Sequence, residues 1–303
     1  AKVEKLPLVD DEGKLRGLIT SKDIVKVSEY PHATKDSKGR LRVGAAIGIK
    51  DDLPRARALV ASGVDALVID IAHGHSAHVL KTIENIRKNL GDVQLIAGNV
   101  ATAEGAKDLI RAGVDAVKVG VGPGSHCTTR IVAGVGVPQL SAVMECAEGA
   151  RDTGVPIIAD GGIRYGGDLV KALGVGAGSV MVGGPFAGTE ESPGVTVMRN
   201  GRKYKISRGM ASSSANMTRK QLDQKSKQPR FEGFDDYVAE GVEGLAPYRG
   251  SVHELLGQLI GGLRSGMSYC NARTLAELRA NIQFRRITQA GWRESMPHDV
   301  ELL

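Results

Sequence analysis

The residue best placed for chemistry in this chain is Cys127, which lies in a loop of small residues after an apolar run. The loop contains three glycines and three hydroxyl residues: Gly120, Gly122, Gly124, Ser125, Thr128 and Thr129. Such a loop can present backbone N–H groups to an anion or backbone carbonyls to a cation. Because His126 and Arg130 flank the thiol, we expect Cys127 to be a nucleophile rather than an ordinary buried small residue.

Two pairs of glycines follow two later apolar runs and form a second candidate element. The sequence there places a carboxylate before the first pair: Asp160, Gly161 and Gly162, then Gly183 and Gly184. Either pair alone would be explained by a tight turn. Both together near the end of a β/α barrel favour a phosphate site, since only bare backbone can wrap the phosphate oxygens. Asp160 could then bind two hydroxyls of a ribose.

A third group of polar residues surrounds a His-x-His pattern. His73 and His75 follow Asp70, and such a pair invites a zinc interpretation. No third ligand has a convincing spacing, so we expect both histidines to be structural and Asp70 to be a hydrogen-bonding residue at a strand end. Cys146 and Cys270 lie in helix-like surroundings and are expected to be ordinary small residues.

The elements that position these residues repeat from residue 42 onward as an apolar run, a turn and an amphipathic stretch. Continuous apolar runs predict strands buried on both faces at residues 43–47, 66–69, 94–97, 116–119, 156–159 and 179–182. Helical periodicity covers residues 52–62, 75–89, 102–112 and 168–173. Polar or glycine-rich residues follow nearly every strand, which favours a β/α barrel over an open sheet with one switch point.

Two segments depart from this repeat. Residues 6–19 predict a β-hairpin, followed by a short helix over residues 21–27 whose cap is Ser21 and by a polar linker. Residues 198–250 are polar and weakly periodic, and so long a loop in a compact domain is either functional or disordered.

The composition limits the classes of function. The chain has 303 residues, of which 42 % are hydrophobic and 24 % charged, as is typical of a globular protein. Its net charge of +6 fits an anionic metabolite at least as well as nucleic acid, and 4 % aromatic residues argue against a stacking surface for single strands. Three cysteines without disulfide or metal spacing favour the cytoplasm. No apolar run approaches the roughly 20 residues of a membrane span.

With these motifs in this order, the chain resembles the inosine 5'-monophosphate (IMP) dehydrogenase and guanosine 5'-monophosphate (GMP) reductase family over essentially its whole length. The most specific stretches are residues 122–125, 127–139, 159–165 and 294–300. The resemblance implies an α/β fold, a (β/α)8 TIM barrel with six of its eight strands visible here. It also implies a C-terminal part of an inserted CBS module at residues 1–30, a linker at 31–41, and a catalytic barrel at 42–303 with a mobile flap at 215–245.

The family's activity would be NAD-dependent oxidation of IMP to xanthosine monophosphate through a covalent Cys127 intermediate, in guanine nucleotide biosynthesis. Thr129 and Arg230 would activate the water that hydrolyses this intermediate. The implied substrate-binding residues are Ser125, Asp160, Gly161, Gly162, Gly183, Gly184, Met210, Ala211 and Glu240. Those implied to bind NAD are Asp70, Asn99, Gly120 and Gly122. Backbone carbonyls implied to bind potassium come from Gly122, Gly124 and Cys127, with Glu294, Ser295 and Met296 from an adjacent subunit of a homo-oligomer, expected to be a tetramer.

Several positions differ from the family pattern. Phe231 follows Arg230 where a tyrosine is usual, which could slow hydrolysis while sparing hydride transfer. His126 replaces an apolar residue and could activate the thiol, touch the purine or act as a neutral spacer. The family's first two barrel strands would precede residue 1, so we expect an isolated chain to expose two sheet edges.

Three alternatives remain open on the sequence. A GMP reductase shares the barrel and the cysteine but uses NADPH and releases ammonia. A non-catalytic protein would bind purine nucleotide without a covalent adduct at Cys127. Nucleic-acid binding rests only on the net charge.

Overall fold

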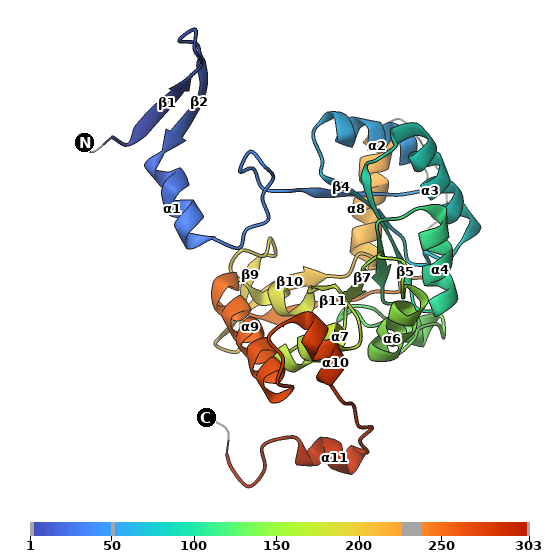
Figure 1. Ribbon diagram of the computed structural model, residues 1–303. Coiled ribbons are helices and arrows are strands. Elements are labelled where there is room, and N and C mark those ends of the chain that lie inside the picture. Colours follow the sequence, from blue (N-terminus) through green and yellow to red (C-terminus); the bar gives the residue numbers. More distant parts are fainter. Residues whose placement is uncertain (1–2, 50–51, 226–237, 302–303) are drawn as a thin grey trace.

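The computed structural model describes residues 3–49, 52–225 and 238–301, and its centre is a six-stranded parallel sheet (Figure 1). The strands are β3 (Gly44–Ile47), β4 (Ala66–Asp70), β5 (Gln94–Val100), β6 (Ala116–Val119), β7 (Ile157–Asp160) and β8 (Ser179–Met181). Each strand pairs with the next one along the chain, so the strand order never reverses. A doubly wound sheet reverses its order at a switch point, whereas a β/α barrel does not. The predicted α/β fold with a parallel sheet is confirmed.

Helices join these strands and cover the outside of the sheet (Figure 1). They are α2 (Asp52–Ala61), α3 (Ala77–Leu90), α4 (Ala103–Ala112), the short α5 (Thr129–Val132), α6 (Gln139–Gly149) and α7 (Gly166–Gly174). Hydroxyl side chains begin two of them: Ser76 accepts the N–H of Val79, and Thr102 accepts that of Gly105. The helices and strands bury a common apolar core that includes Leu67, Ile69, Ile83, Leu95, Leu109 and Val117. This rigid core holds the loops at the carboxyl ends of the strands.

After β8 the chain passes through the 3-10 helix η1 (Gly184–Gly188) and then forms a second, antiparallel sheet. Its strands are β9 (Thr196–Arg199), β10 (Arg202–Arg208) and β11 (Glu243–Pro247), and helix α8 (Ser213–Lys225) lies between the last two. The expectation of one long loop over residues 198–250 was therefore wrong for the described part. The ammonium of Lys205 is buried and donates to the carbonyls of Glu190 and Ser192, which ties this sheet to the segment after η1.

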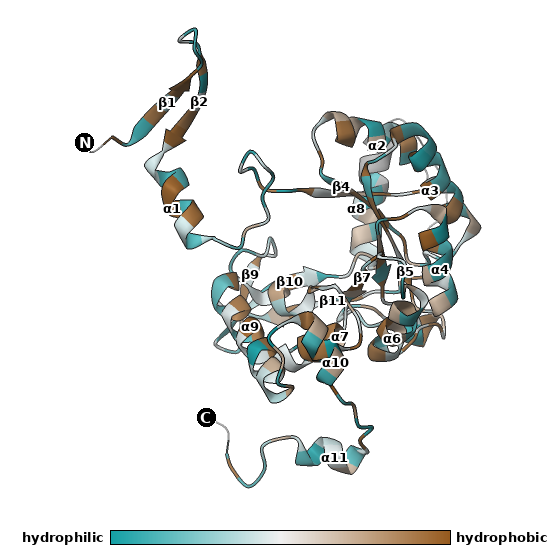
Figure 2. Cartoon of the chain, in the orientation of Figure 1, coloured by the Kyte–Doolittle hydropathy of each residue, from teal (hydrophilic) through white to brown (hydrophobic). Residues whose placement is uncertain are grey.

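The amino-terminal residues form a small unit of their own. Strands β1 (Lys5–Val9) and β2 (Leu15–Thr20) make the predicted hairpin, and helix α1 (Ser21–Glu29) follows. The prediction that Ser21 caps this helix was wrong. Thr20 is the cap, because its hydroxyl accepts the N–H of Asp23 while the Asp23 carboxylate accepts the N–H of Thr20. Figures 1 and 2 show this unit apart from the large sheet, with apolar residues along both strands and the helix.

Three helices complete the chain: α9 (Val252–Tyr269), α10 (Leu275–Asn281) and α11 (Gln289–Glu294). Helix α9 packs against α7, where Gly262 faces Gly166. Helix α11 has no buried residue and lies away from the large sheet (Figure 1). Among the helices in the described ranges, none combines the length and apolar character needed to cross a membrane.

Candidate functional site

The cysteine loop begins where β6 ends, directly beside the end of β7. Gly120 starts the loop with φ of 149°, and its N–H donates to the carbonyl of Val100. A Cβ atom at Gly120 would overlap the carbonyl oxygen of Asp160. Only glycine therefore allows the loop to leave β6 so close to β7.

The loop packs against both pairs of glycines. A Cβ atom at Gly184 would lie 3.0 Å from the Ser125 Oγ, and one at Gly161 would lie 2.9 Å from the Pro123 Cγ. The ring of His126 makes a hydrogen bond of 2.9 Å between its Nδ1 and the Ser125 Oγ. The structure thus brings together Ser125 and the glycines expected to bind phosphate, and the His126 ring is engaged by Ser125.

The Cys127 thiol heads a chain of hydrogen bonds that ends on a carboxylate. Its Sγ donates to the Thr129 Oγ1 at 3.2 Å, and the Thr129 hydroxyl donates to the Glu240 Oε2 at 2.7 Å. A backbone hydrogen bond also joins the two segments, because the N–H of Thr128 donates to the Glu240 carbonyl at 2.8 Å. Glu240, expected only as a purine contact, is thus also linked through Thr129 to the thiol.

The residues expected to contact the purine lie beside the hydrogen bonds that link Cys127, Thr129 and Glu240. The N–H of Gly209 donates to the Val242 carbonyl, and the N–H of Val242 donates to the His126 carbonyl. A Cβ atom at Gly241 would lie 3.1 Å from the Ala211 carbonyl carbon, so that segment packs against residues 240–242. Met210 is 90 % exposed, which leaves its apolar side chain free to meet a ligand.

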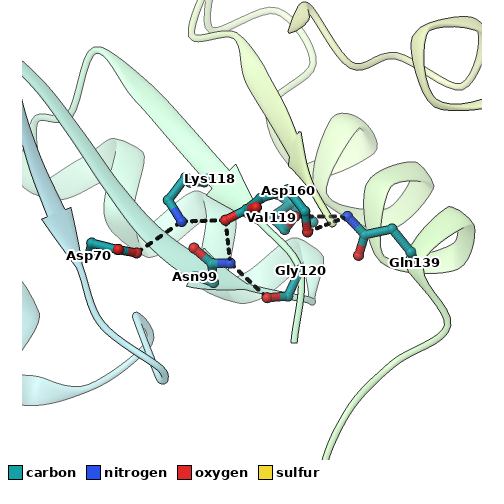
Figure 3. Close-up of polar contacts among 7 residues, drawn as sticks. All are labelled: Asp70, Asn99, Lys118, Val119, Gly120, Gln139 and Asp160. Carbon is teal, nitrogen blue, oxygen red and sulfur yellow. Dashed lines mark hydrogen bonds and ion pairs between the residues drawn. The ribbon is translucent and has the colours of Figure 1, made fainter. Parts of the chain in front are cut away.

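Behind the loop, polar residues from four neighbouring strands form one network (Figure 3). The Lys118 Nζ lies 2.9 Å from the Asp70 Oδ1 and also contacts the Asp160 Oδ2. The Asn99 Nδ2 donates to the Asp160 Oδ2 at 3.1 Å and to the Gly120 carbonyl at 2.7 Å. This network joins three expected ligand-binding side chains, those of Asp70, Asn99 and Asp160.

Sequence reasoning missed two members of this network. Gln139 donates from its Nε2 to the carbonyls of Val119 and Asp160, and so holds the ends of β6 and β7 together. Lys118 was treated as part of an apolar run, although a charged residue inside a buried strand was itself a signal of a buried partner. Burial lowers the pKa of Lys118, but the nearby carboxylates of Asp160 and Asp70 raise it by more, so the pKa lies above its usual value.

The remaining candidate residues lie elsewhere. His75 bonds Asp108 of α4 through its Nε2 at 2.7 Å, which agrees with a structural role, and this hydrogen bond lowers the pKa of Asp108. Over the described ranges, no group of three or more His, Cys, Asp or Glu side chains is arranged to hold a metal ion. Burial raises the pKa of the Cys146 thiol to about 12, and Cys270 is half-buried.

Two further expectations concern the ends of the candidate site. The structure does not bring Glu294, Ser295 and Met296 to the cysteine loop of the same chain, since α11 lies apart from the large sheet (Figure 1). Arg230 and Phe231 lie outside the described residues, as does the middle of the flap expected at residues 215–245.

Comparison with known proteins places these observations in a family. Residues 19–298 match the model described as the IMP dehydrogenase / GMP reductase domain. The inosine-5'-monophosphate dehydrogenase of Aquifex aeolicus is 58 % identical over 302 residues, which are 99 % of this chain and 61 % of that protein. That of Nitrosopumilus maritimus is 54 % identical over 303 residues, or 100 % of this chain and 63 % of the relative. The chain thus spans about three-fifths of the length of these relatives.

A solved structure agrees with the sequence matches. A Trypanosoma brucei GMP reductase variant in complex with guanosine 5'-monophosphate superposes with a TM-score of 0.91 at 46 % identity. The match covers 99 % of this chain and 61 % of that one. The six-stranded parallel sheet and its helices therefore have the same fold as the matched part of that structure.

Proposed function

Because the chain belongs to the IMP dehydrogenase / GMP reductase family, we propose that it carries out the NAD-dependent oxidation of IMP to xanthosine monophosphate. This is a step of guanine nucleotide biosynthesis. The observation that carries the proposal is the hydrogen-bond chain from Cys127 through Thr129 to Glu240, set beside glycine pairs suited to a phosphate. A nucleophile, a path for its proton and a candidate anion site thus lie together in this protein.

The proposed architecture extends what the sheet shows. The six strands would belong to a (β/α)8 TIM barrel, since their sequential order is that of a barrel. Residues 1–30 would be the C-terminal part of a CBS module, residues 31–41 a linker and residues 42–303 the catalytic barrel. The separate hairpin and helix at the amino terminus support this division. We assign the protein to the cytoplasm as a homo-oligomer, a tetramer by the family pattern.

The substrate would lie across the carboxyl ends of the strands. Its phosphate would be held by the Ser125 hydroxyl and by the bare backbone at Gly162 and Gly184. A Cβ atom at Gly184 would crowd the Ser125 Oγ at 3.0 Å. Its ribose hydroxyls would meet the Asp160 carboxylate, which is 22 % exposed. The purine would lie against the segment of Met210 and Ala211, which the structure places beside the cysteine loop.

In the first half of the reaction the Cys127 sulfur bonds to C2 of the purine. The thiol proton has a path through the Thr129 hydroxyl to Glu240. A bound NAD would supply the acceptor for the hydride of C2, and Cys127 keeps the oxidised purine attached through its sulfur. In the second half, Thr129 and Arg230 activate a water, the water oxygen bonds to C2, and the sulfur leaves to give xanthosine monophosphate and a free thiol.

The residues present fit the two cofactors that the family implies. Asp70 is 55 % exposed at the end of β4, and the Asn99 Oδ1 is buried without a hydrogen-bond partner, which leaves an acceptor for a dinucleotide hydroxyl or amide. Potassium would be held by the backbone carbonyls of Gly122, Gly124 and Cys127, because neutral carbonyl oxygens suit an alkali cation. Glu294 and its neighbours from another subunit would complete that site and keep the loop ordered.

The test is NADH formation from IMP and NAD, first in potassium and then in sodium buffer. We expect potassium-dependent turnover that the Cys127→Ala variant lacks. NADPH-dependent release of ammonia from GMP would instead assign the chain to the reductase branch, to which the similar Trypanosoma brucei structure belongs. A folded chain that binds IMP without forming any adduct at Cys127 would be a purine-nucleotide-binding protein.

A further inference from the structure

The polar network behind the cysteine loop is centred on a buried lysine that the proposed reaction does not use (Figure 3). The Lys118 side chain is only 4 % exposed, and its ammonium contacts Asp70 of β4 and Asp160 of β7. Burying an ammonium without a counter-charge is costly. Lys118 therefore stays buried only because carboxylates on both sides of it supply that charge.

The lysine reaches Asp70 across an intervening strand because residue 98 of that strand has no side chain. Asp70, Gly98 and Lys118 are register partners on β4, β5 and β6, so their side chains share one face of the sheet. A Cβ atom at Gly98 would lie 2.7 Å from the Lys118 Cβ. Any other residue at position 98 would displace the lysine, so three strands together build its path.

The two carboxylates differ in how completely the protein holds them. Asp160 is 22 % exposed and also accepts a hydrogen bond from the Asn99 Nδ2. Asp70 is 55 % exposed, and Lys118 is its one ion-pair partner among the described residues. A ligand hydroxyl that binds Asp70 would therefore weaken the ion pair between Asp70 and Lys118. The ammonium of Lys118 would then interact more strongly with Asp160.

On the proposed function, these carboxylates serve different ligands, Asp160 the ribose of the purine nucleotide and Asp70 the dinucleotide. Resting on that function, we propose that Lys118 is a positioning residue that fixes both carboxylates and couples the two subsites by sharing one ammonium between them. The carboxylates also raise the pKa of Lys118 further than burial lowers it, so the ammonium keeps its charge at neutral pH. Coupling through a shared group changes both affinities reciprocally.

The test is a double-mutant cycle in which IMP is titrated calorimetrically into four chains without dinucleotide. The chains are unsubstituted, Asp70→Asn, Lys118→Met and the double variant. We expect Lys118→Met to weaken IMP binding by about 10-fold or more, since Asp160 loses a charged partner. We expect Asp70→Asn to change IMP affinity by about threefold when Lys118 is present and not at all in the Lys118→Met chain.

Two further variants separate this role from simple stabilisation. Lys118→Arg keeps the charge and should restore most of the IMP affinity. Lys205→Met removes another buried lysine, which donates to the carbonyls of Glu190 and Ser192 in the segment after η1, and should lower the midpoint of thermal unfolding without changing IMP affinity. If Lys118→Met does not fold, the cycle is completed with Lys118→Gln, which removes the charge but keeps a polar side chain, and the Asp70→Asn effect should again be lost.

The outcomes distinguish the inference from the function on which it rests. No binding of IMP by the unsubstituted chain overturns both. Binding of IMP that is unchanged in Lys118→Met, or an Asp70→Asn effect that is equal with and without Lys118, overturns the coupling alone.

Discussion

The thiols of Cys127 and Cys146 differ in what surrounds them, and their reactivity should differ accordingly. Cys127 lies half-buried in the loop, whereas Cys146 is buried and donates to the Thr102 carbonyl. Because burial raises the pKa of Cys146 to about 12, roughly one in 10,000 of these thiols is ionised at pH 8. We expect iodoacetamide at pH 8 to alkylate Cys127 far ahead of Cys146, as followed by peptide mass spectrometry. IMP should protect Cys127, and equal rates at both thiols would contradict the assignment.

The carboxylate at the end of the thiol's hydrogen-bond chain allows a second test. Glu240→Gln keeps the size of the side chain but removes the charge that accepts the Thr129 proton. We expect NADH formation to fall by about 100-fold while IMP binding changes much less. Glu243→Gln, an exposed neighbour on β11, is the matched control and should leave the rate unchanged. A normal rate in Glu240→Gln would remove Glu240 from the proton path.

At the level of residues, the sequence predicts local motifs well and distant partners poorly. The cysteine loop and the glycine pairs are contiguous, so their residue types and order suffice. Glu240 meets Thr129 across 111 residues, and Lys118 meets Asp160 across 42, so neither contact leaves a local signal. Lys118 was overlooked because its strand is otherwise apolar, although its burial makes it the centre of the network.

At the level of elements, the start of α7 is held by a carboxylate whose contribution should depend on pH. Asp168 accepts the N–H groups of Arg164 and Tyr165 and pairs with Lys171. Burial raises the pKa of Asp168, but Lys171 and the backbone donors lower it by more, so the pKa lies below its usual value. Its stabilising effect is therefore complete above the unfolded pKa and is lost as the pH falls through the lower folded value.

We expect Asp168→Asn to lower the free energy of unfolding by about 1 kcal/mol at pH 7. The loss should be smaller at pH 2 than at pH 7, because the native carboxylate becomes protonated as the pH falls through its lowered pKa. Denaturant unfolding at both pH values measures the difference. Asp152→Asn, at an exposed position with φ of 64°, is the control. A loss of equal size at both pH values would show that the charge of Asp168 does not hold the helix.

The predicted elements succeeded where they were regular and local. All six apolar runs are strands, and helices occur at the predicted stretches. The antiparallel sheet was missed although β9 and β10 form a local hairpin around Asn200 and Gly201, both with positive φ, and such an Asn-Gly pair is itself a hairpin signal. Only the pairing of β10 with β11, as of Tyr204 with Pro247, is distant in the sequence and leaves no local signal. The cap of α1 was misplaced by one residue because Thr20 and Ser21 are both suitable hydroxyls, and the capping box with Asp23 decides between them.

At the scale of the whole molecule, the carboxyl-terminal segment carries apolar side chains that its own chain leaves uncovered. Ile287, Trp292 and Met296 are 57, 45 and 45 % exposed, and α11 contributes no buried residue. On the proposed function this segment completes the potassium site of another subunit. The partner that covers this segment is then a second copy of the chain. The same contact would cover the three exposed apolar side chains.

Complementation between two inactive variants tests this arrangement. One variant lacks residues 289–303, which leaves its core intact because α11 buries nothing, and the other carries Cys127→Ser with its carboxyl-terminal segment in place. Each alone should be inactive. When the two are unfolded and refolded together, random assortment places a native cysteine beside a native segment in about a quarter of the sites, so about a quarter of the native rate should return. Simple mixing without subunit exchange is the control. Full activity of the shortened variant, or no recovery after the two refold into mixed oligomers, would contradict a segment supplied by the neighbouring subunit.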